Sequence, residues 1–398
     1  INCVKKIFTS LICNRLQLWA EEFNLLYEGQ NGFRRSRGCT DNLFVLSFII
    51  NDKIRLKSGK LFVYFVDFSQ AFDRVHHAKL WYKLSRLGVS AKLIRIISGF
   101  YNNAKAEISV NLRDRVTVDV SNGVLQGDSL SPLLFSLFVA DFEGFFVRRG
   151  LKGVDLDEGN SINSLFYADD LVLFAESSIK MKKCLSVLES YCAENSMLVN
   201  KKKSKMMVFR NGGKLNRHCI FTFHNEEIEI SSSFKYLGVV FTPSGGFRKA
   251  AEASVVNSNF AACGVRSLIS KSGTVSLETW STLFRSMVES TLLYGSEVWG
   301  LMQGDILERV QVKFVKSLYY LHSSTPGYAL RLEFGLKKLI LCVFSRALRW
   351  LNKVLLMDEN RFPRICLSRQ MKTFASVPTL FSWLGQLGSW FERGGFAG

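Results

Sequence analysis

The sequence predicts an α+β protein in which a small antiparallel sheet is followed by a helical C-terminal region. Strand-like apolar runs fall between residues 61 and 241, and turn signals join several of them as hairpins. Helical periodicity fills the segment before this region and returns after it. The turn-rich segment Pro243–Gly246 separates the two patterns, so we expect a domain boundary within about four residues of it.

The N-terminal segment predicts two helices that lead into a buried strand. The helices cover Lys6–Leu26 and Thr40–Leu56, the second of which begins at a capping residue. The run Leu61–Val66 is β-favouring and apolar without alternation, as in a central strand covered on both faces. Asp67 therefore stands at the C-terminal end of a central strand.

The next segments predict two short helices, a hairpin and one long buried helix whose first turn contains a proline. The segments are His77–Leu87, Ala91–Tyr101, Ala106–Val110 with Arg115–Val120, and Ser129–Val147.

A second hairpin is predicted by two short apolar segments, Ile162–Tyr167 and Leu171–Ala175. The adjacent pair Asp169-Asp170 stands at its tip. An amphipathic helix follows over Lys180–Glu194, and short strand patterns alternate with turns from Lys205 to Phe241.

The charge of the chain predicts a polyanionic partner. Lysine and arginine number 52 against 34 acidic residues, which gives a net charge of +18. Nucleic acid and a membrane surface are the two polyanions to consider. No apolar run approaches the roughly 18 residues that span a bilayer, so we expect no membrane insertion. The 9 cysteines form no C-x-x-C pair, which favours a reducing compartment.

Three acids stand where strands end or turn: Asp67, Asp169 and Asp170. Carboxylates held close together repel one another unless a hard cation compensates them. Mg²⁺ binds one or two protein carboxylates together with substrate phosphates. These residues therefore predict a two-metal site for phosphoryl transfer. The alternative is that the Asp-Asp pair is an ordinary hairpin turn.

Several segments in chain order resemble the motifs of reverse transcriptases. The segments that are similar to motifs A, B and C are Phe65–Asp73, Gly123–Pro132 and Phe166–Asp170. Those similar to motif D, to the primer-grip motif E and to the finger motif of the non-LTR (LINE-type) branch are Leu198–Ser204, Phe234–Gly238 and Gln30–Thr40. The resemblance covers residues 5–245, and more loosely Leu293–Trp299, which is similar to a segment beyond the polymerase core.

The resemblance implies a right-hand polymerase with an antiparallel-sheet palm. Residues 1–60 would form partial fingers, residues 61–245 the palm with inserted fingers elements and the primer grip, and residues 246–398 an α-helical thumb and C-terminal extension. It implies an RNA-directed DNA polymerase that extends a DNA 3′ end on an RNA template, as in target-primed reverse transcription. The implied partners are an RNA template, a DNA primer and dNTPs, with no membrane, in a nuclear and cytoplasmic ribonucleoprotein.

The resemblance also implies the metal and catalytic residues. Asp67 and Asp169 would bind two Mg²⁺ ions, with Mn²⁺ as an alternative metal, and Asp170 would be a supporting ligand. Lys203 would protonate the leaving pyrophosphate. Asp73, six residues after Asp67, is a rival acid, but its position in a turn favours a structural role.

The resemblance implies two further groups of site residues. The nucleotide-binding group is Arg34, Arg37, Phe68, Phe72, Gln126 and Gly127, in which Phe72 would exclude a ribose 2′-hydroxyl. The primer-grip group is Phe234, Tyr236, Leu237 and Gly238. Other interpretations are a basic loop for the two arginines, core packing for Phe72 and an ordinary turn for Gly127.

A basic cluster between Val199 and Arg217 predicts contact with phosphates without base specificity. It consists of Lys201, Lys202, Lys203, Lys205, Arg210, Lys214 and Arg217. The family commonly has an acid where this chain has His76. The chain begins partway through the fingers motifs, so we expect it to be part of a longer polyprotein that carries an endonuclease domain elsewhere.

Two alternative functions stay open at this point. The first is a nucleic-acid-binding remnant of a mobile element that keeps the acids but has lost catalysis. The second is a protein similar to group II intron maturases. The residues of the finger and primer-grip motifs disfavour this second alternative.

Overall fold

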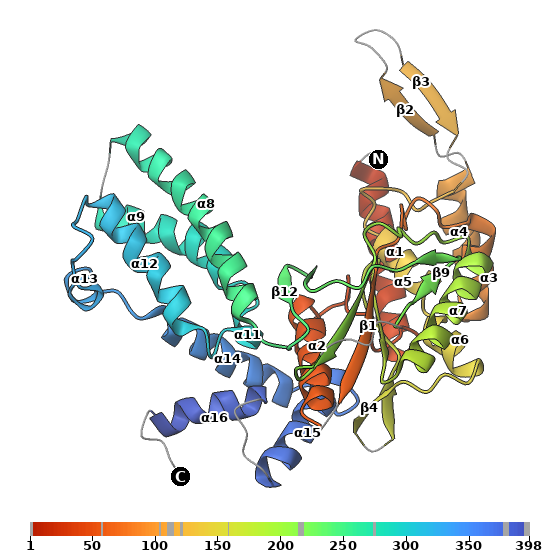
Figure 1. Ribbon diagram of the computed structural model, residues 1–398. Coiled ribbons are helices and arrows are strands. Elements are labelled where there is room, and N and C mark those ends of the chain that lie inside the picture. The colour runs from red at the N-terminus through yellow and green to blue at the C-terminus, as the bar shows by residue number, and fades with distance from the viewer. Residues whose placement is uncertain are drawn as a thin grey trace.

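The computed structural model describes residues 3–56, 59–102, 105–109, 115–119, 122–157, 159–213, 219–273, 276–376 and 382–393. A helical part, formed by α8 to α14, stands beside a part that contains the sheet (Figure 1). We call residues 248–355 of this helical part the helical arm.

The central sheet has four strands in the order β6-β7-β1-β8, and every neighbouring pair is antiparallel. The strands are β1 (Lys60–Val66), β6 (Ser164–Tyr167), β7 (Asp170–Ala175) and β8 (Lys205–Arg210). Every residue of β1 after Lys60 is buried. The prediction of a central strand covered on both faces is confirmed.

Five helices agree with the predicted ones to within four residues at either end. They are α1 (Cys3–Glu22), α2 (Cys39–Ile54), α3 (His77–Arg86), α4 (Ala91–Asn102) and α7 (Ser178–Asn195).

The prediction of one long helix over Ser129–Val147 is wrong. The structure has two helices there, α5 (Ser131–Phe138) and α6 (Phe142–Arg148). The break brings the Asp141 carboxylate within reach of two donors, the half-buried Lys83 Nζ at 2.7 Å and the buried Tyr191 hydroxyl at 2.9 Å. These contacts come from distant segments, so the local sequence pattern could not indicate the break.

Four two-stranded sheets surround the central one. Their strands are β2 (Lys105–Ser109) with β3 (Arg115–Asp119), β4 (Val154–Asp157) with β5 (Asn160–Ile162), β9 (Thr222–Phe223) with β10 (Glu226–Glu227), and β11 (Phe234–Tyr236) with β12 (Val239–Phe241). The β4–β5 hairpin was not predicted.

After β12 the described elements are all helical. They are α8 (Arg248–Ser272), α9 (Leu277–Leu283), the π-helix η1 (Phe284–Glu289), α10 (Ser290–Leu292), α11 (Ser296–Trp299), α12 (Gly304–Leu318), α13 (Gly327–Glu333), α14 (Leu339–Leu355), α15 (Phe362–Ser376) and α16 (Trp383–Arg393). The change from strands to helices falls where the turn-rich segment predicts it.

The hydrophobic core divides at the sheet. Alternate residues of β1 point to opposite faces, so Phe62, Tyr64 and Val66 join one buried cluster and Leu61, Val63 and Phe65 join the other. The second cluster continues through α2 into the helical arm, where Trp299 belongs to it. The core is therefore continuous across the predicted domain boundary.

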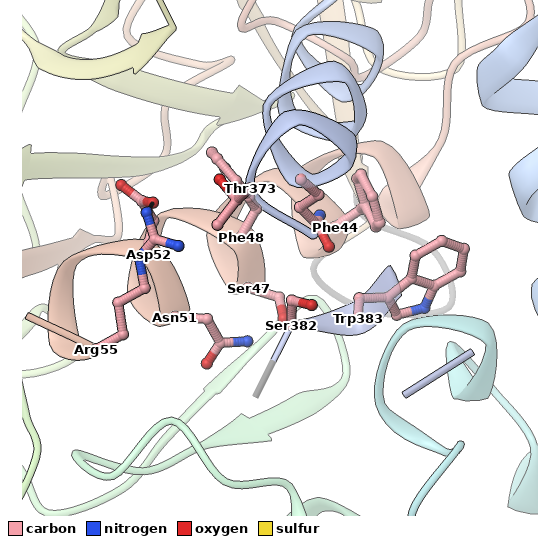
Figure 2. Close-up of a pocket in the computed structure, with 10 residues that line it drawn as sticks. Phe44, Ser47, Phe48, Asn51, Asp52, Arg55, Thr373, Ser382 and Trp383 are labelled. Atoms are coloured by element: carbon pink, nitrogen blue, oxygen red, sulfur yellow. Dashed lines mark ion pairs between the residues drawn. The ribbon is translucent and has the colours of Figure 1, made fainter. Parts of the chain in front are cut away.

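The C-terminal helices return to the sheet part and pack against α2. Trp383 lies edge-on to Phe44 with ring centroids 5.2 Å apart, and Arg369 forms an ion pair with Asp52 at 3.1 Å. Figure 2 shows the small cavity of about 40 Å³ left between these elements, with Phe44, Asp52 and Trp383 in its wall. A cavity of that size has no room for a substrate, so this region is a packing interface.

Arg361 provides a test of this interface. Its guanidinium contacts Asp41 at 2.5 Å, and Asp41 is fully buried. Arg361→Gln would leave this carboxylate without its guanidinium partner, so we expect a loss of about 3–5 kcal/mol in the free energy of unfolding. Urea unfolding measures the loss. The control is Arg349→Gln on the exposed face of α14, which should change stability by less than about 0.5 kcal/mol. Equal effects of the two changes would contradict the role given to Arg361.

Candidate active site

The three predicted acids meet at one edge of the central sheet. Asp67 follows β1, Asp169 lies in the turn between β6 and β7, and Asp170 is the first residue of β7. In the antiparallel register Val66 pairs with Leu171, which places Asp67 opposite Asp170. The turn itself contains Ala168 with a positive φ of 59°.

The electrostatics of this edge show that the carboxylates interact. Partial burial and the charge of Asp67 raise the pKa of Asp169 above its ordinary value. Burial, together with the charges of Asp169 and Asp67, raises the pKa of Asp170 to about 6. Ionising all three acids is therefore unfavourable unless a cation is present.

The donor set fits a metal that is shared with substrate. Within the described ranges, no group of three or more His, Cys, Asp or Glu side chains is arranged to hold a metal ion. Mg²⁺ does not need such a group, because it keeps several waters and binds through one or two carboxylates plus phosphates. Carboxylate oxygens are hard ligands, and their mutual repulsion favours a cation beside Asp67 and Asp169.

A cavity of about 230 Å³ opens beside the acids. Its wall contains Asp67, Asp170 and Lys203, together with residues of β11 and Leu237. Lys203 is exposed. The cavity thus brings together two of the three predicted metal ligands, the predicted proton donor and three of the four predicted primer-grip residues. Asp169, in the adjacent turn, and Gly238 are not among the residues that line it.

The segment 198–204 is held against the end of β1 by backbone contacts. The Asn200 amide donates to the Asp67 carbonyl at 2.7 Å, and the Asp67 amide donates to Ser204 Oγ at 3.0 Å. These bonds fix the position of Lys203 relative to Asp67.

The basic cluster around Lys203 is partly neutralised. Lys201 forms an ion pair with Glu226, and Lys205 forms one with Glu229. Lys214 and Arg217 lie outside the described residues.

The predicted primer-grip residues form a tight hairpin on the same edge. Phe234 stacks on Phe65 with ring centroids 4.3 Å apart, and the Tyr236 hydroxyl accepts a hydrogen bond from Asn42 at 2.9 Å. Leu237 and Gly238 both have positive φ, at 43° and 84°, which suits a two-residue hairpin turn.

The predicted nucleotide-binding turn lies beside the motif A segment. Gln126 Nε2 donates to Asp73 at 2.9 Å, which gives Asp73 a structural contact. Gly127 has a φ of +79°, and a Cβ built there would meet no atom within 4 Å. The turn therefore needs glycine for its backbone conformation and leaves open space above it.

The two aromatic residues of the predicted nucleotide site differ in exposure. Phe72 is half-buried and stacks on Phe135 with ring centroids 4.6 Å apart, and Phe33 lies edge-on to it with centroids 6.3 Å apart. Phe68 is buried, and its backbone pairs with Val199. Phe72 is thus the one of the two that has an accessible face.

Arg34 and Arg37 already have partners within the protein. Arg34 binds Glu21 through two nitrogens and also donates to the carbonyls of Tyr27 and Gln30. Arg37 pairs with Glu28 at 2.7 Å. Their side chains are 4% and 7% exposed, so these contacts give both a structural role. A triphosphate could be bound by either one only if these ion pairs broke.

Gln30 and Gly32 support the acid turn, and their role was not predicted. Gln30 Oε1 accepts hydrogen bonds from the amides of Gly32 and Ala168, at 2.9 Å and 3.1 Å. A Cβ on Gly32 would lie 2.2 Å from the Ala168 nitrogen. The glycine in the finger motif could have indicated a close backbone contact at Gly32. Nothing in the sequence indicates that the contact is with Ala168, 136 residues later.

A second unpredicted contact connects the helical arm with the hairpin. A Cβ on Gly238 would lie 2.8 Å from the ring of Tyr294. The Cys39 thiol lies near both tyrosines: its interaction with Tyr167, together with burial, raises the pKa of that hydroxyl to about 12, and burial together with Cys39 raises the pKa of Tyr294. The segment Leu293–Trp299 thus reaches the residue that precedes the acid turn.

Comparisons with known proteins agree with the motifs. A family model described as reverse transcriptase (RNA-dependent DNA polymerase) matches residues 1–241. A retrovirus-related Pol polyprotein from type-1 retrotransposable element R2 of Nasonia vitripennis is 30% identical over 247 residues, which cover 60% of this chain and 23% of the relative. The RNA-directed DNA polymerase from mobile element jockey of Drosophila funebris is 25% identical over 332 residues, which cover 81% of this chain and 35% of the relative.

A solved structure is also similar to the chain. Apo telomerase from Candida tropicalis is 11% identical, with a TM-score of 0.45, and the match covers 95% of this chain and 61% of the telomerase chain.

The chain belongs to the reverse transcriptase (RNA-dependent DNA polymerase) family, because the family model covers more than half of it. The family predicted from the motifs is confirmed, and both curated relatives come from mobile elements, as a resemblance to the non-LTR branch predicts. The family implies a right-hand polymerase fold and divalent metal ions. The chain spans only 23% and 35% of the length of these two relatives. Over the described residues, no helix has both the length and the apolar character to cross a membrane.

The raised pKa of Asp170 predicts how stability depends on pH. In the folded chain this pKa is about 6, above its ordinary value of 3.8. The stabilising contribution of the protonated form is therefore complete below about pH 4 and is lost as the pH rises through 6. Asp170→Asn is neutral at every pH, so its melting temperature should exceed that of the wild type by a margin that grows between pH 5 and 7. Millimolar Mg²⁺ should narrow the margin at pH 7. A margin that is independent of pH would contradict the electrostatic account.

Gly32→Ala tests the support of the acid turn. The added methyl group would overlap the backbone of Ala168, so the turn must shift, and we expect a loss of about 1–3 kcal/mol in the free energy of unfolding. The control is Gly99→Ala in α4, where a Cβ meets no atom within 4 Å and helix propensity should stabilise the protein by about 1 kcal/mol. Urea unfolding of both variants measures the difference. Equal stabilities of the two variants would show that Gly32 does not touch the turn.

Proposed function

We propose that this chain is an RNA-directed DNA polymerase that extends a DNA 3′ end on an RNA template with dNTPs, as in target-primed reverse transcription. The observation that carries the proposal is the cavity whose wall contains Asp67, Asp170 and Lys203 together with β11 and Leu237. Metal ligands, a proton donor and a support for the primer strand are the groups that nucleotidyl transfer needs in one place.

Asp67 and Asp169 would hold two Mg²⁺ ions, and Mn²⁺ could replace them. When bound, these ions would neutralise charge on the triphosphate and on the attacking 3′-hydroxyl. The pKa of Asp170 is raised to about 6, so this carboxyl is partly protonated near neutral pH and would be a supporting ligand. Lys203 would protonate the pyrophosphate as it leaves, and its place in the wall of the same cavity as Asp67 and Asp170 supports this role.

The nucleotide would lie over the Gln126–Gly127 turn with its sugar against Phe72. Support for this position comes from the open space above Gly127 and from the half-buried ring of Phe72. Phe135 stacks on that ring and Phe33 contacts it edge-on, and these contacts would support the ring against a 2′-hydroxyl.

We assign the palm to the central sheet with the helices on it, the primer grip to the β11–β12 hairpin and the thumb to the helical arm. The ion-paired Arg34 and Arg37 would stabilise the fingers segment next to the acid turn. Arg35, exposed and bonded to Asn14 at 2.9 Å, is the neighbouring cation with freedom to reach a triphosphate.

Primer extension on homopolymer RNA with Mg²⁺ tests the proposal. Asp67→Asn or Asp169→Asn should reduce nucleotide addition at least about a hundredfold, because each removes an anionic metal ligand. Folding and RNA binding should persist, since neither side chain belongs to the core. The rate constant of single-nucleotide addition and the affinity for RNA are measured together.

The matched control is Asp73→Asn, which removes the rival acid. We expect a much smaller loss from it, because Asp73 contacts Gln126 rather than the other carboxylates. If the wild-type chain binds RNA but adds no nucleotide, the chain is a nucleic-acid-binding remnant and the proposal fails. If Asp73→Asn is the more damaging change, the assignment of the metal ligands is wrong.

A further inference from the structure

A groove of about 750 Å³ lies on the helical arm, away from the acids. Residues of α12 and of the loop after it, as far as Gly327, line this groove. Figure 1 shows α12 and α13 on the side of the arm that faces away from the central sheet. A ligand in this groove would therefore not occupy the proposed active site.

The groove is positively charged along one helix face. Arg309, Lys313 and Lys316 follow one another at intervals of four and three residues, so their side chains lie on the same face of α12 over about 10 Å. Arg309 and Lys313 are exposed and have no ion-pair partner among the described residues. Lys316 donates to the Ser323 carbonyl at 2.5 Å.

The acid in the groove wall does not neutralise these cations. Glu308 is paired with Arg331 at 2.6 Å and accepts a hydrogen bond from the Ile340 amide at 3.1 Å. Its charge is thus directed toward α13 and α14, and the groove keeps the positive potential of its three cations. A phosphate backbone is the partner that fits such a surface.

Tyr320 adds an aromatic ring to the wall of the groove. The residue is 95% exposed, and its backbone has a φ of 53°. This left-handed conformation is unfavourable for residues other than glycine. Neither feature helps the protein to fold, since an exposed ring buries no area and the backbone is strained. An exposed ring beside a row of cations is the arrangement on which unpaired bases stack.

We propose that this groove binds single-stranded nucleic acid, with phosphates on Arg309, Lys313 and Lys316 and a base on Tyr320. The chemistry favours a single strand, because the bases of a duplex are stacked on one another and offer no face to the ring. The site would hold a strand outside the catalytic cleft while a primer and its template occupy the cleft. It does not depend on the chain being catalytically active.

The test measures the binding of labelled 12-nucleotide oligo(U) and oligo(dT) to the chain by fluorescence anisotropy in 0.1 M salt. The double variant Arg309→Gln/Lys313→Gln should weaken binding at least about tenfold. The slope of log affinity against log salt should fall by about 1.4, because roughly 0.7 counterions are released per phosphate contact on a single strand. Stronger binding of oligo(U) would assign the groove to RNA, and equal binding would assign it to either nucleic acid.

Tyr320→Gly separates stacking from folding. Glycine accepts the positive φ, so the melting temperature should be unchanged or higher, while loss of the ring should weaken binding about 5- to 100-fold. Tyr320→Phe keeps the ring and should bind as the wild type does.

Lys182→Gln/Lys183→Gln provides the charge control, since it removes two exposed lysines from α7. It should leave the affinity within about twofold of the wild type. An equal loss in this control, or wild-type binding by both groove variants, would overturn the proposal. Primer extension should be unchanged in the groove variants if the wild type is active, and a parallel loss would show that the groove is part of the catalytic cleft.

Discussion

The pairing of β1 with β7 is the constraint on which the rest of the structure depends. Its antiparallel register sets Val66 against Leu171 and so places Asp67 opposite Asp170. A slip of one residue would exchange the faces of every side chain on β1. Phe62, Tyr64 and Val66 would then leave one core cluster for the other, so burial on both faces of the strand fixes the register of the acids.

Around this pair, two separate segments hold the backbone of the acids in place against the repulsion between their carboxylates. Gln30 bonds to both the amide and the carbonyl of Ala168 in the acid turn. Asn200 and Ser204 bond to the backbone of Asp67. These contacts reach backbone atoms and leave the carboxylates open to the cavity. The protein thus maintains a cluster of carboxylates whose repulsion is relieved either by protonation of Asp170 or by a bound cation, and relief by a cation is the electrostatic condition for a metal-dependent site.

The parts of the site that could be predicted from sequence are the parts that local pattern controls. The uniform apolar run of β1 and the turn at Asp169-Asp170 are both short-range features, and the structure places the acids where these patterns predict. The ion pairs of Arg34 and Arg37, by contrast, depend on the tertiary fold and not on the local sequence pattern. Glu21 and Glu28 bind them only because α1 and the following loop fold back on the finger motif. No spacing in the sequence distinguishes a buried ion-paired arginine from one that waits for a phosphate.

Long-range packing explains the remaining differences. The helix predicted over Ser129–Val147 is interrupted so that Asp141 can meet Lys83 and Tyr191, which come from α3 and α7. The predicted boundary near Pro243 marks a change from strands to helices. It does not mark a break in the core, because Phe65 of β1 and Trp299 of the arm belong to one buried cluster. Sequence composition indicates where strands give way to helices. Whether the two regions share one hydrophobic core depends on which faces of their helices and strands pack together, which composition does not indicate.

The shared core also limits how the helical arm can move relative to the acids. The ring of Tyr294 covers the Gly238 turn so closely that a single methyl group there would overlap it. Trp299 bonds to the Tyr294 carbonyl at 3.0 Å, and Glu297 bonds to Thr40 of the fingers segment at 2.9 Å. A rotation of the arm that separated Tyr294 from Gly238 would expose apolar surface that is now buried and break the hydrogen bond between Thr40 and Glu297. Closely packed interfaces of this kind resist gradual deformation. The base of the arm and the β11–β12 hairpin should therefore move as one body, which keeps the hairpin at a constant distance from Asp67.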